Sequence, residues 1–206
     1  MTTTRRILPA VLLFAFIAGC DGSGDSILDQ FAAPSGSEPL DPGEGTISGD
    51  FGIGSASLNG SFAWSDRWTN PSSGQEQGFI VLSDDPDMCN DLEAVSLTAS
   101  SEFAILQVIV VTATVDAPTE PGDFEIDGPS GNVAFANYYA LDADCGDAGN
   151  AELATGTVTL TAVSGNHFEG TFDGETAGDD RVRGGFNPAN CFLDPFFAAT
   201  SVICNP

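Results

Sequence analysis

The chain has 206 residues, with 30 acidic residues against five Arg and no Lys, and 42% of it is hydrophobic. This composition excludes nucleic-acid binding through a basic surface, because the chain has too few cations to neutralise phosphates. The hydrophobic content excludes a disordered acidic tail. Beyond the first 20 residues, no apolar run is long enough for a helix to cross a membrane.

Residues 1–19 are predicted to form a removable export signal. Arg5 and Arg6 precede an apolar stretch, 7–17, which is too short to span a bilayer. The following Ile17-Ala18-Gly19-Cys20 resembles the lipobox of bacterial lipoproteins, with Ile in place of the commoner Leu. The resemblance implies that Cys20 is diacylated and becomes the first residue. The alternative is an ordinary secretory signal followed by a chance cysteine.

Acyl chains on Cys20 would make the membrane a partner of this protein, because two or three chains bind far more firmly than one. The expected location is the bacterial envelope, at the outer membrane or the periplasmic side of the inner membrane. Loss of the signal leaves three Arg against 30 acids, a formal charge of −27. Residues 20–45 are rich in Gly, Ser, Pro and Asp and are predicted to be a flexible tether reaching about 25–30 Å. Residues 46–206 are predicted to form a single β-domain.

From residue 46 onward the dominant period of the hydrophobic pattern is two. Clusters of Gly, Pro, Asn and Asp separate the apolar runs, as in antiparallel sheets with one wet face. We therefore expect an all-β domain, an antiparallel β-sandwich or barrel of about 8–9 strands. The clearest alternations group Leu58, Phe62 and Trp64, then Val133, Phe135, Tyr139 and Leu141, whereas residues 79–82 and 104–115 are apolar or β-branched with little interruption.

One segment departs from this pattern. Met88, Leu92 and Val95 follow one another at helical spacing, and Asp87 is a plausible N-cap. The spacing predicts one short helix over residues 87–98.

The C-terminal strands allow their register to be predicted, because the inward faces must stay together. The outer face then places Asp173 opposite Arg181 and Glu169 diagonal to Arg183. One predicted row of inward residues places Gly170 beside Gly184. Either an aromatic side chain, Trp64 or Phe62, lies over these two glycines or the sheet bends there. The predicted inward rows are Val158–Phe172–Val182, Leu160–Gly170–Gly184 and Ala162–Phe168–Phe186.

The mature chain resembles uncharacterised bacterial lipoproteins in which a tether leads to a small β-domain. The residues that carry this resemblance form turns and strands. The resemblance implies a fold type and an envelope location, and it implies no activity. The matching stretches are 58–64 (LNGSFAW), 121–124 (PGDF), 156–161 (GTVTLT) and 184–187 (GGFN).

Four cysteines remain besides Cys20: Cys89, Cys145, Cys191 and Cys204. An even number in an exported chain predicts two disulfides, and no closely spaced pair suggests a metal site instead. Three pairings are possible, of which Cys191–Cys204 is the local one. The resemblance to the lipoproteins implies Cys89–Cys191, which would leave Cys145–Cys204.

Calcium is the one cofactor that the sequence suggests. Oxygen ligands around glycines in a flexible loop suit this hard cation, although the spacing departs from that of an EF-hand. The alternative is a set of solvated acidic loops, and residues 84–87 form a second such cluster. The candidate ligands are Asp142, Asp144, Asp147, Asn150 and Glu152.

Catalytic patterns are not apparent. The single histidine, His167, falls at a predicted turn, no Gly-x-Ser-x-Gly motif is present, and no lysine could form a Schiff base. We therefore expect a non-enzymatic structural or interaction module with an envelope protein or glycan as its partner. The alternative is a small-molecule or carbohydrate binder with a lipocalin-like cavity. Its candidate ligand-binding residues are Trp64, Trp68, Tyr138 and Tyr139.

Overall fold

The computed structural model describes residues 39–51, 58–69, 74–93, 103–114, 116–129, 131–141 and 147–191. Within these ranges lie ten strands and one short helix. Their bounds are β1 (Glu44–Ser48), β2 (Phe62–Thr69), β3 (Glu76–Ser83), α1 (Met88–Glu93), β4 (Phe103–Val111), β5 (Gly122–Ile126), β6 (Val133–Leu141), β7 (Asp147–Ser164), β8 (His167–Thr176), β9 (Arg181–Asn187) and β10 (Ala189–Asn190).

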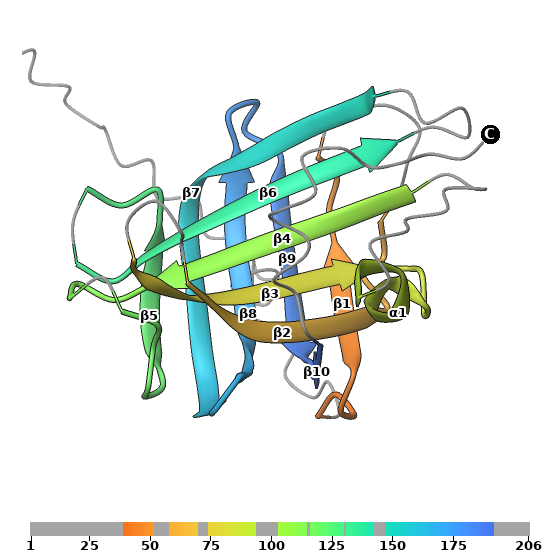
Figure 1. Ribbon diagram of the computed structural model, residues 1–206. Coiled ribbons are helices and arrows are strands. Elements are labelled where there is room, and N and C mark those ends of the chain that lie inside the picture. Colours follow the sequence, from red (N-terminus) through yellow and green to blue (C-terminus); the bar gives the residue numbers. More distant parts are fainter. Residues whose placement is uncertain are drawn as a thin grey trace, which may run out of the picture. The chain divides into compact units, whose positions relative to one another are not determined.

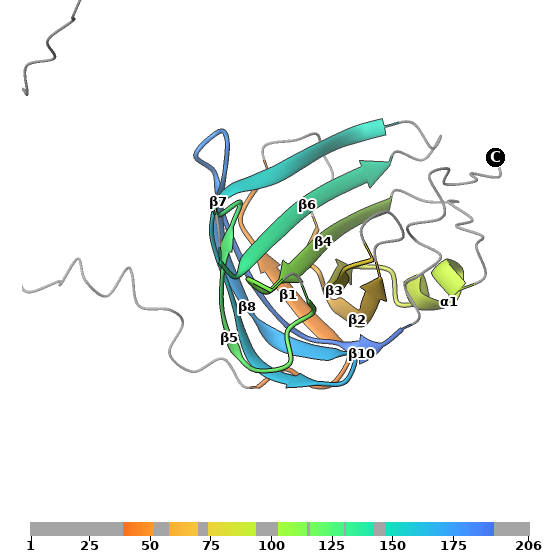
Figure 2. The same cartoon turned by 60° about the vertical axis from the view of Figure 1, so that its left-hand side comes forward.

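Eight of these strands form a closed antiparallel ring in the order β1, β9, β8, β7, β6, β4, β3 and β2 (Figure 1, Figure 2). The short strand β5 pairs antiparallel with β7 and parallel with the start of β6, which makes a nine-stranded mixed barrel. Outside the ring, β10 pairs parallel with β2. The all-β prediction is confirmed, and the architecture is the barrel, which leaves no open sheet edge in the ring.

The ring closes where β1 meets the start of β2. The Ile47 amide donates to the Asn59 carbonyl at 2.6 Å. Asp84, in the turn after β3, accepts hydrogen bonds from the amides of Asn59 and Ser61 at 2.9 and 3.1 Å. Gly60, between them, has φ +65°, and a Cβ there would lie 2.6 Å from the Ile47 side chain. The closing corner therefore needs both a glycine and the Asp84 carboxylate.

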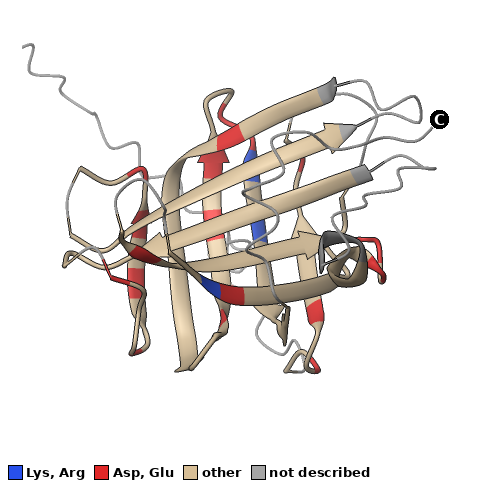
Figure 3. Ribbon diagram, in the orientation of Figure 1, with Lys and Arg blue, Asp and Glu red and all other residues tan. Residues whose placement is uncertain are grey.

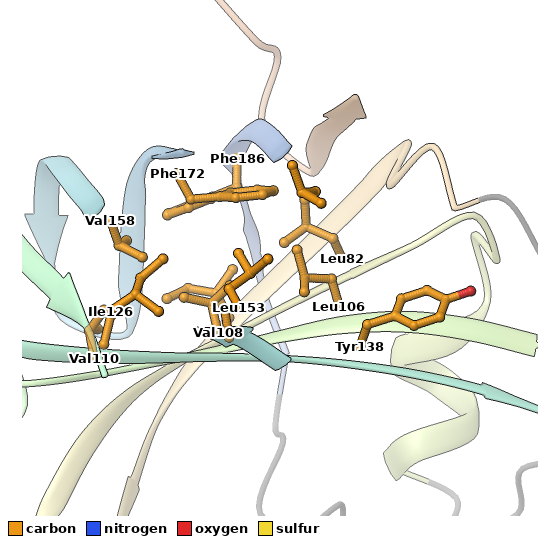
Figure 4. Close-up of a cluster of buried hydrophobic side chains, with 14 of the residues drawn as sticks. Leu82, Leu106, Val108, Val110, Ile126, Tyr138, Leu153, Val158, Phe172 and Phe186 are labelled. Carbon is orange, nitrogen blue, oxygen red and sulfur yellow. The ribbon is translucent and has the colours of Figure 1, made fainter. Parts of the chain in front are cut away.

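The main core lies inside the barrel, where alternate residues of every wall point toward one another (Figure 4). Phe168 on β8 reaches the opposite wall, because a Cβ on Gly78 of β3 would lie 3.0 Å from its ring. Burial of such side chains contributes about 1.5–3 kcal/mol each. The large, fully buried members are Ile80, Leu82, Leu106, Phe124, Tyr138, Leu160, Phe168 and Phe186.

A second core lies outside the barrel, against β2, β3 and β4. Helix α1 covers this part of the wall, with Met88 fully buried (Figure 2). On β3, Ile80 and Leu82 face the lumen while Phe79 and Val81 face α1. Burial on both sides explains why this strand is a continuous apolar run. The members of this second core are Trp64, Phe79, Val81, Met88, Ile105 and Cys191.

The helix begins at Met88, one residue after the predicted start, and is described as far as Glu93. The remainder of the predicted helix, 94–98, lies outside the described residues.

The predicted pairing of β8 with β9 is wrong by two residues. Phe172 lies opposite Gly184 instead of Val182, because the hairpin is tighter than expected. The Thr176 hydroxyl accepts hydrogen bonds from two amides of the turn, so β8 continues to residue 176. Gly170 and Gly184 are therefore not adjacent. The aromatic ring against Gly184 is that of Phe172, 2.5 Å from where a Cβ would be, and not that of Trp64 or Phe62.

Other expectations about these strands are confirmed in part. Val158 lies opposite Phe172 and Leu160 opposite Gly170, as predicted. An irregularity between Leu160 and Ala162 then shifts the pairing, so Phe168 lies opposite Val163 rather than Ala162.

The alternation of Val133, Phe135 and Tyr139 does not mark the lumen face of β6. Val133, Phe135 and Tyr139 point outward, and the lumen-facing residues are Ala134, Ala136, Tyr138 and Ala140. Both faces of this strand are apolar, so the alternation alone did not distinguish inside from outside.

Candidate functional site

One end of the barrel is occupied by Arg67 on β2. Its Nε donates to the Gly165 carbonyl and its Nη2 to the Pro118 carbonyl, both at 2.6 Å. The guanidinium carbon lies 5.2 Å from the centre of the Phe168 ring, which suits a cation–π contact. Arg67 thus links two loops across this end, and its charge is used in packing.

The same end contains a buried carboxylate, Asp66. Its Oδ1 accepts hydrogen bonds from Asn166 Nδ2 at 2.6 Å and from the Arg67 amide at 2.8 Å. The Ser65 hydroxyl donates to the Asn166 carbonyl at 2.7 Å. These bonds hold the β7–β8 turn against β2, and they explain how polar groups can be buried here.

The other end is occupied by an aromatic stack. Phe51, which follows β1, lies parallel to Tyr138 of β6 with ring centres 4.4 Å apart. Burial raises the pKa of Tyr138, and the charges of Asp50 and Asp84 raise it further. The Tyr138 hydroxyl therefore stays protonated around neutral pH. Arg67 thus occupies one end of the lumen, and the stacked rings of Phe51 and Tyr138 occupy the other. A ligand cavity between the two ends stays a prediction.

The four aromatic residues predicted to bind a ligand do not form one platform. Trp64 is buried on the outer side of β2, whereas Tyr138 faces the lumen. Tyr139 points outward because successive residues of a strand alternate. Trp68 is half-buried near the far end of β2, where it pairs with Gln77.

Only part of the predicted calcium loop can be placed. Asp142 and Asp144 lie outside the described residues, and Asp147 is described only as the first residue of β7. Asn150 and Glu152 are exposed on β7, beside β6. Over the residues that the structure describes, no group of three metal-ligating side chains comes together. The calcium site stays a prediction.

Two of the predicted cysteines form a disulfide. Cys89 of α1 joins Cys191, with 5.8 Å between their Cα atoms, so the pairing implied by the lipoprotein resemblance is confirmed. Cys20, Cys145 and Cys204 lie outside the described residues.

His167 has a structural contact, since its Nδ1 lies 2.9 Å from the Pro188 carbonyl oxygen. On the outer face of the β8–β9 hairpin, Arg181 donates two hydrogen bonds to Asp173, and Arg183 lies 3.9 Å from the same carboxylate. The predicted Asp173–Arg181 pair is confirmed. It spans a diagonal, because Asp173 lies directly opposite Arg183.

An exposed apolar surface is the feature that sequence patterns did not identify. We call the outward residues of two neighbouring strands the β4–β6 outer face. Phe135 and Tyr139 are the large hydrophobic residues that stay exposed in the described part of the chain, at 43% and 42%. Neither β4 nor β6 contains a charged residue, in a chain that is otherwise strongly acidic (Figure 3). This lack of charge in two neighbouring strands is the sequence feature that could have indicated an apolar outer face. The exposed part of this face is Phe135 and Tyr139 of β6, with half-buried Ile109 of β4 and Asn137 of β6 beside them, whereas Ile105 and Gln107 of β4 are buried.

Comparison of the chain with protein-family models, with curated proteins and with solved structures finds no match. In the described ranges, none of the helical structure has the length and hydrophobicity that a membrane-crossing helix requires.

Proposed function

We propose that this protein is a lipid-anchored module of the bacterial envelope, with a rigid barrel on a tether and no catalytic role. The observation that carries the proposal is the stretch Ile17-Ala18-Gly19-Cys20 directly after an apolar segment. The Cys89–Cys191 disulfide supports export, because disulfides persist in oxidising compartments and are rare in the cytosol.

The polar side chains of the barrel support a structural role. Arg67 and Asp66 hold one end together, Asp84 holds the closing corner, and His167 contacts a carbonyl. Each of these groups therefore has a role in the fold. We infer that the module acts by binding an envelope protein or glycan, with the tether setting its distance from the membrane.

The anchor is tested by Cys20→Ser, with Ser23→Ala as the matched control in the same tether. Wild type and control should fractionate with membranes, whereas Cys20→Ser should be soluble or retained as an unprocessed precursor. Mass spectrometry of the N-terminal peptide should show acyl chains on Cys20. An N-terminal peptide without acyl chains in the wild type would disprove the anchor and the location built on it.

A binder of small molecules or carbohydrates is the second candidate, favoured only by the barrel architecture itself. Phe51, Phe168 and Arg67 occupy the ends of the lumen, so a lumen ligand would have to displace one of them. Thermal unfolding with fatty acids and oligosaccharides separates the two proposals. A ligand at 100 times its Kd would stabilise the protein by about 2.7 kcal/mol, and the structural module predicts no such shift.

A further inference from the structure

We propose that the exposed strip along β6 binds a linear, uncharged glycan, whose sugar rings stack on Phe135 and Tyr139 and hydrogen-bond to the polar side chains beside them. This inference rests on the proposed function, because it names the class of partner that the module binds, and it places the site on the outer wall instead of in the lumen. The β6 strip consists of Phe135, Asn137 and Tyr139 of β6 with Asn150 and Glu152 of β7.

The two aromatic side chains of the strip lie in line on one face of one strand. Tyr138 points into the lumen, so Asn137 and Tyr139 point outward, as does Phe135. Phe135 and Tyr139 are 43% and 42% exposed, and four residue steps along a strand separate them by about 14 Å. Asn137 lies midway between them and is half-buried. The strip therefore alternates an aromatic ring, an amide and a second aromatic ring.

Polar side chains border the strip on the side of β7. Asn150 lies opposite Tyr139 and Glu152 lies opposite Asn137, and both β7 residues are exposed. Residues directly opposite in antiparallel strands place their side chains on the same face. Burial raises the pKa of Tyr139, and the charge of Glu152 raises it further, so the hydroxyl stays protonated around neutral pH. The strip thus offers both donors and acceptors to the hydroxyls of a sugar.

The apolar part of the strip is too small to hold a folded partner or a second copy by itself. A fully buried aromatic side chain removes about 150–250 Å² from water, so the exposed fractions of Phe135 and Tyr139 leave at most about 210 Å² for the two together. A stable protein interface needs about 800 Å² on each partner. On the side of β4, Ile105 and Gln107 are buried, so the strip does not widen there. Its occupant is therefore narrow and extended.

An extended peptide is the other narrow occupant, and the pairing of β6 disfavours it. Extended peptides bind sheets by adding a strand at a free edge. Strand β6 pairs with β4 over residues 133–141 and with β7 over residues 137–141, so the strip lies on a closed wall. A peptide laid over this wall would leave backbone groups above aromatic rings without partners. A sugar ring instead presents apolar C–H groups to an aromatic ring and keeps its hydroxyls at the edge.

Charge selects an uncharged glycan. Neither β4 nor β6 contains a charged residue, and the chain as a whole has a net charge of −25. A polyanion would be repelled by this field and by Glu152 at the border of the strip. A polycation would find only Glu152 in the strip and many carboxylates elsewhere on the protein.

Affinity electrophoresis in native gels tests the strip, because retardation detects the weak binding expected from two aromatic rings. The neutral probes are glycol chitin, hydroxyethyl cellulose, laminarin and soluble starch, and polygalacturonate is the anionic probe. The parent protein is the full mature chain with Cys20→Ser, so that acyl chains do not contribute. At least one neutral polysaccharide should retard the parent, and polygalacturonate should not.

Variants of the parent locate the binding. Phe135→Ser with Tyr139→Ser should lose most of the retardation, whereas Tyr139→Phe, which keeps the ring, should retain most of it. Thr171→Ala, exposed on β8, is the matched control and should migrate like the parent. Tyr139→Ser alone should lose part of the retardation, which keeps the test valid if the double variant does not fold. Urea midpoints report the folding of each variant.

Equal retardation of the parent and a folded double variant would overturn the strip, because the glycan would then bind elsewhere, as in the lumen. The absence of retardation by every neutral polysaccharide would overturn the glycan as occupant. Retardation by polygalacturonate as strong as that by the neutral probes would overturn the argument from charge. Acylation of Cys20 is measured on the wild type by mass spectrometry, so failure of the strip and failure of the proposed anchor are distinguished.

Discussion

Two walls of this barrel differ in how many of their faces are buried. The wall of β2, β3 and β4 is buried on both faces, since the lumen lies on one side and α1 with Cys191 on the other. The wall of β7, β8 and β9 is buried mainly on the lumen side, and β8 alternates buried and exposed residues along most of its length. A continuous apolar run and a strict alternation are therefore two outcomes of one rule, in which the number of covered faces decides the pattern.

The largest expected effect comes from removing the Cys89–Cys191 disulfide, which fastens α1 beside the wall of β2, β3 and β4. Cys89→Ala with Cys191→Ala should lower the free energy of unfolding by about 4–5 kcal/mol, because a closed loop of roughly 100 residues restricts the unfolded chain. Urea unfolding measures this change. Reducing agent should destabilise the wild type more than the variant, because only the wild type contains the Cys89–Cys191 bond. An unchanged urea midpoint would show that α1 is held by packing alone.

The second effect compares the outer faces of the two walls directly. Phe79→Ala should cost about 3–5 kcal/mol, as for a core phenylalanine, because the side chain is fully buried against α1. Thr171→Ala, on the exposed face of β8, is the matched control and should change stability by no more than about 0.5 kcal/mol. Similar losses at both positions would contradict the distinction between the walls.

The third effect concerns the seam where the covered wall joins β1. Asp84→Ala should cost about 1–3 kcal/mol, because the amides of Asn59 and Ser61 lose their acceptor. Glu76→Ala, exposed at the opposite end of β3, should be nearly neutral and serves as the control. Chemical unfolding measures both variants, and a neutral Asp84→Ala would mean that β1 and β2 close the ring without this carboxylate.

The smallest effect is expected on the exposed face of the β8–β9 hairpin. The hydrogen bonds from Arg181 lower the pKa of Asp173, and the charges of Arg181 and Arg183 add to this. A carboxylate with a lowered folded-state pKa stabilises the protein above its unfolded pKa, near 3.9. This contribution is lost as the pH falls through the folded value.

Urea midpoints between pH 2 and pH 6 test this for wild type and Asp173→Asn. The difference between the two proteins should be greatest near pH 6, should shrink below about pH 4, where free aspartate is protonated, and should be smaller in high salt. Asp180→Asn in the same hairpin is the control. A difference that does not depend on pH would show that the ion pair does not stabilise the fold.

Several features of this fold could be predicted from the sequence because their causes are local. The alternation of β8 indicated which residues face the lumen, and the spacing of Met88 and Leu92 indicated a helix where α1 begins. Asp173 and Arg181 were predicted to pair, because charges on one face of a tight hairpin lie close together.

Features that depend on a turn's side-chain contacts or on distant segments could not be predicted in this way. The two-residue shift between β8 and β9 follows from the Thr176 hydroxyl in the turn, which no periodicity reveals. The outward face of β6 is as apolar as its lumen face, so the alternation along this strand did not indicate which side faces the lumen. For the same reason, the sequence could not show which of the adjacent aromatics Tyr138 and Tyr139 faces the lumen.

The sequence by itself determined that the domain is all-β and acidic, because composition and period are properties of single segments. Only the tertiary structure decided that the sheet closes into a barrel, that Cys89 pairs with Cys191, and that one wall is covered on both faces. Closure, pairing and cover all depend on contacts between residues far apart in the chain. Those contacts are set by the three-dimensional path of the backbone, and a local hydrophobic pattern is compatible with many such paths.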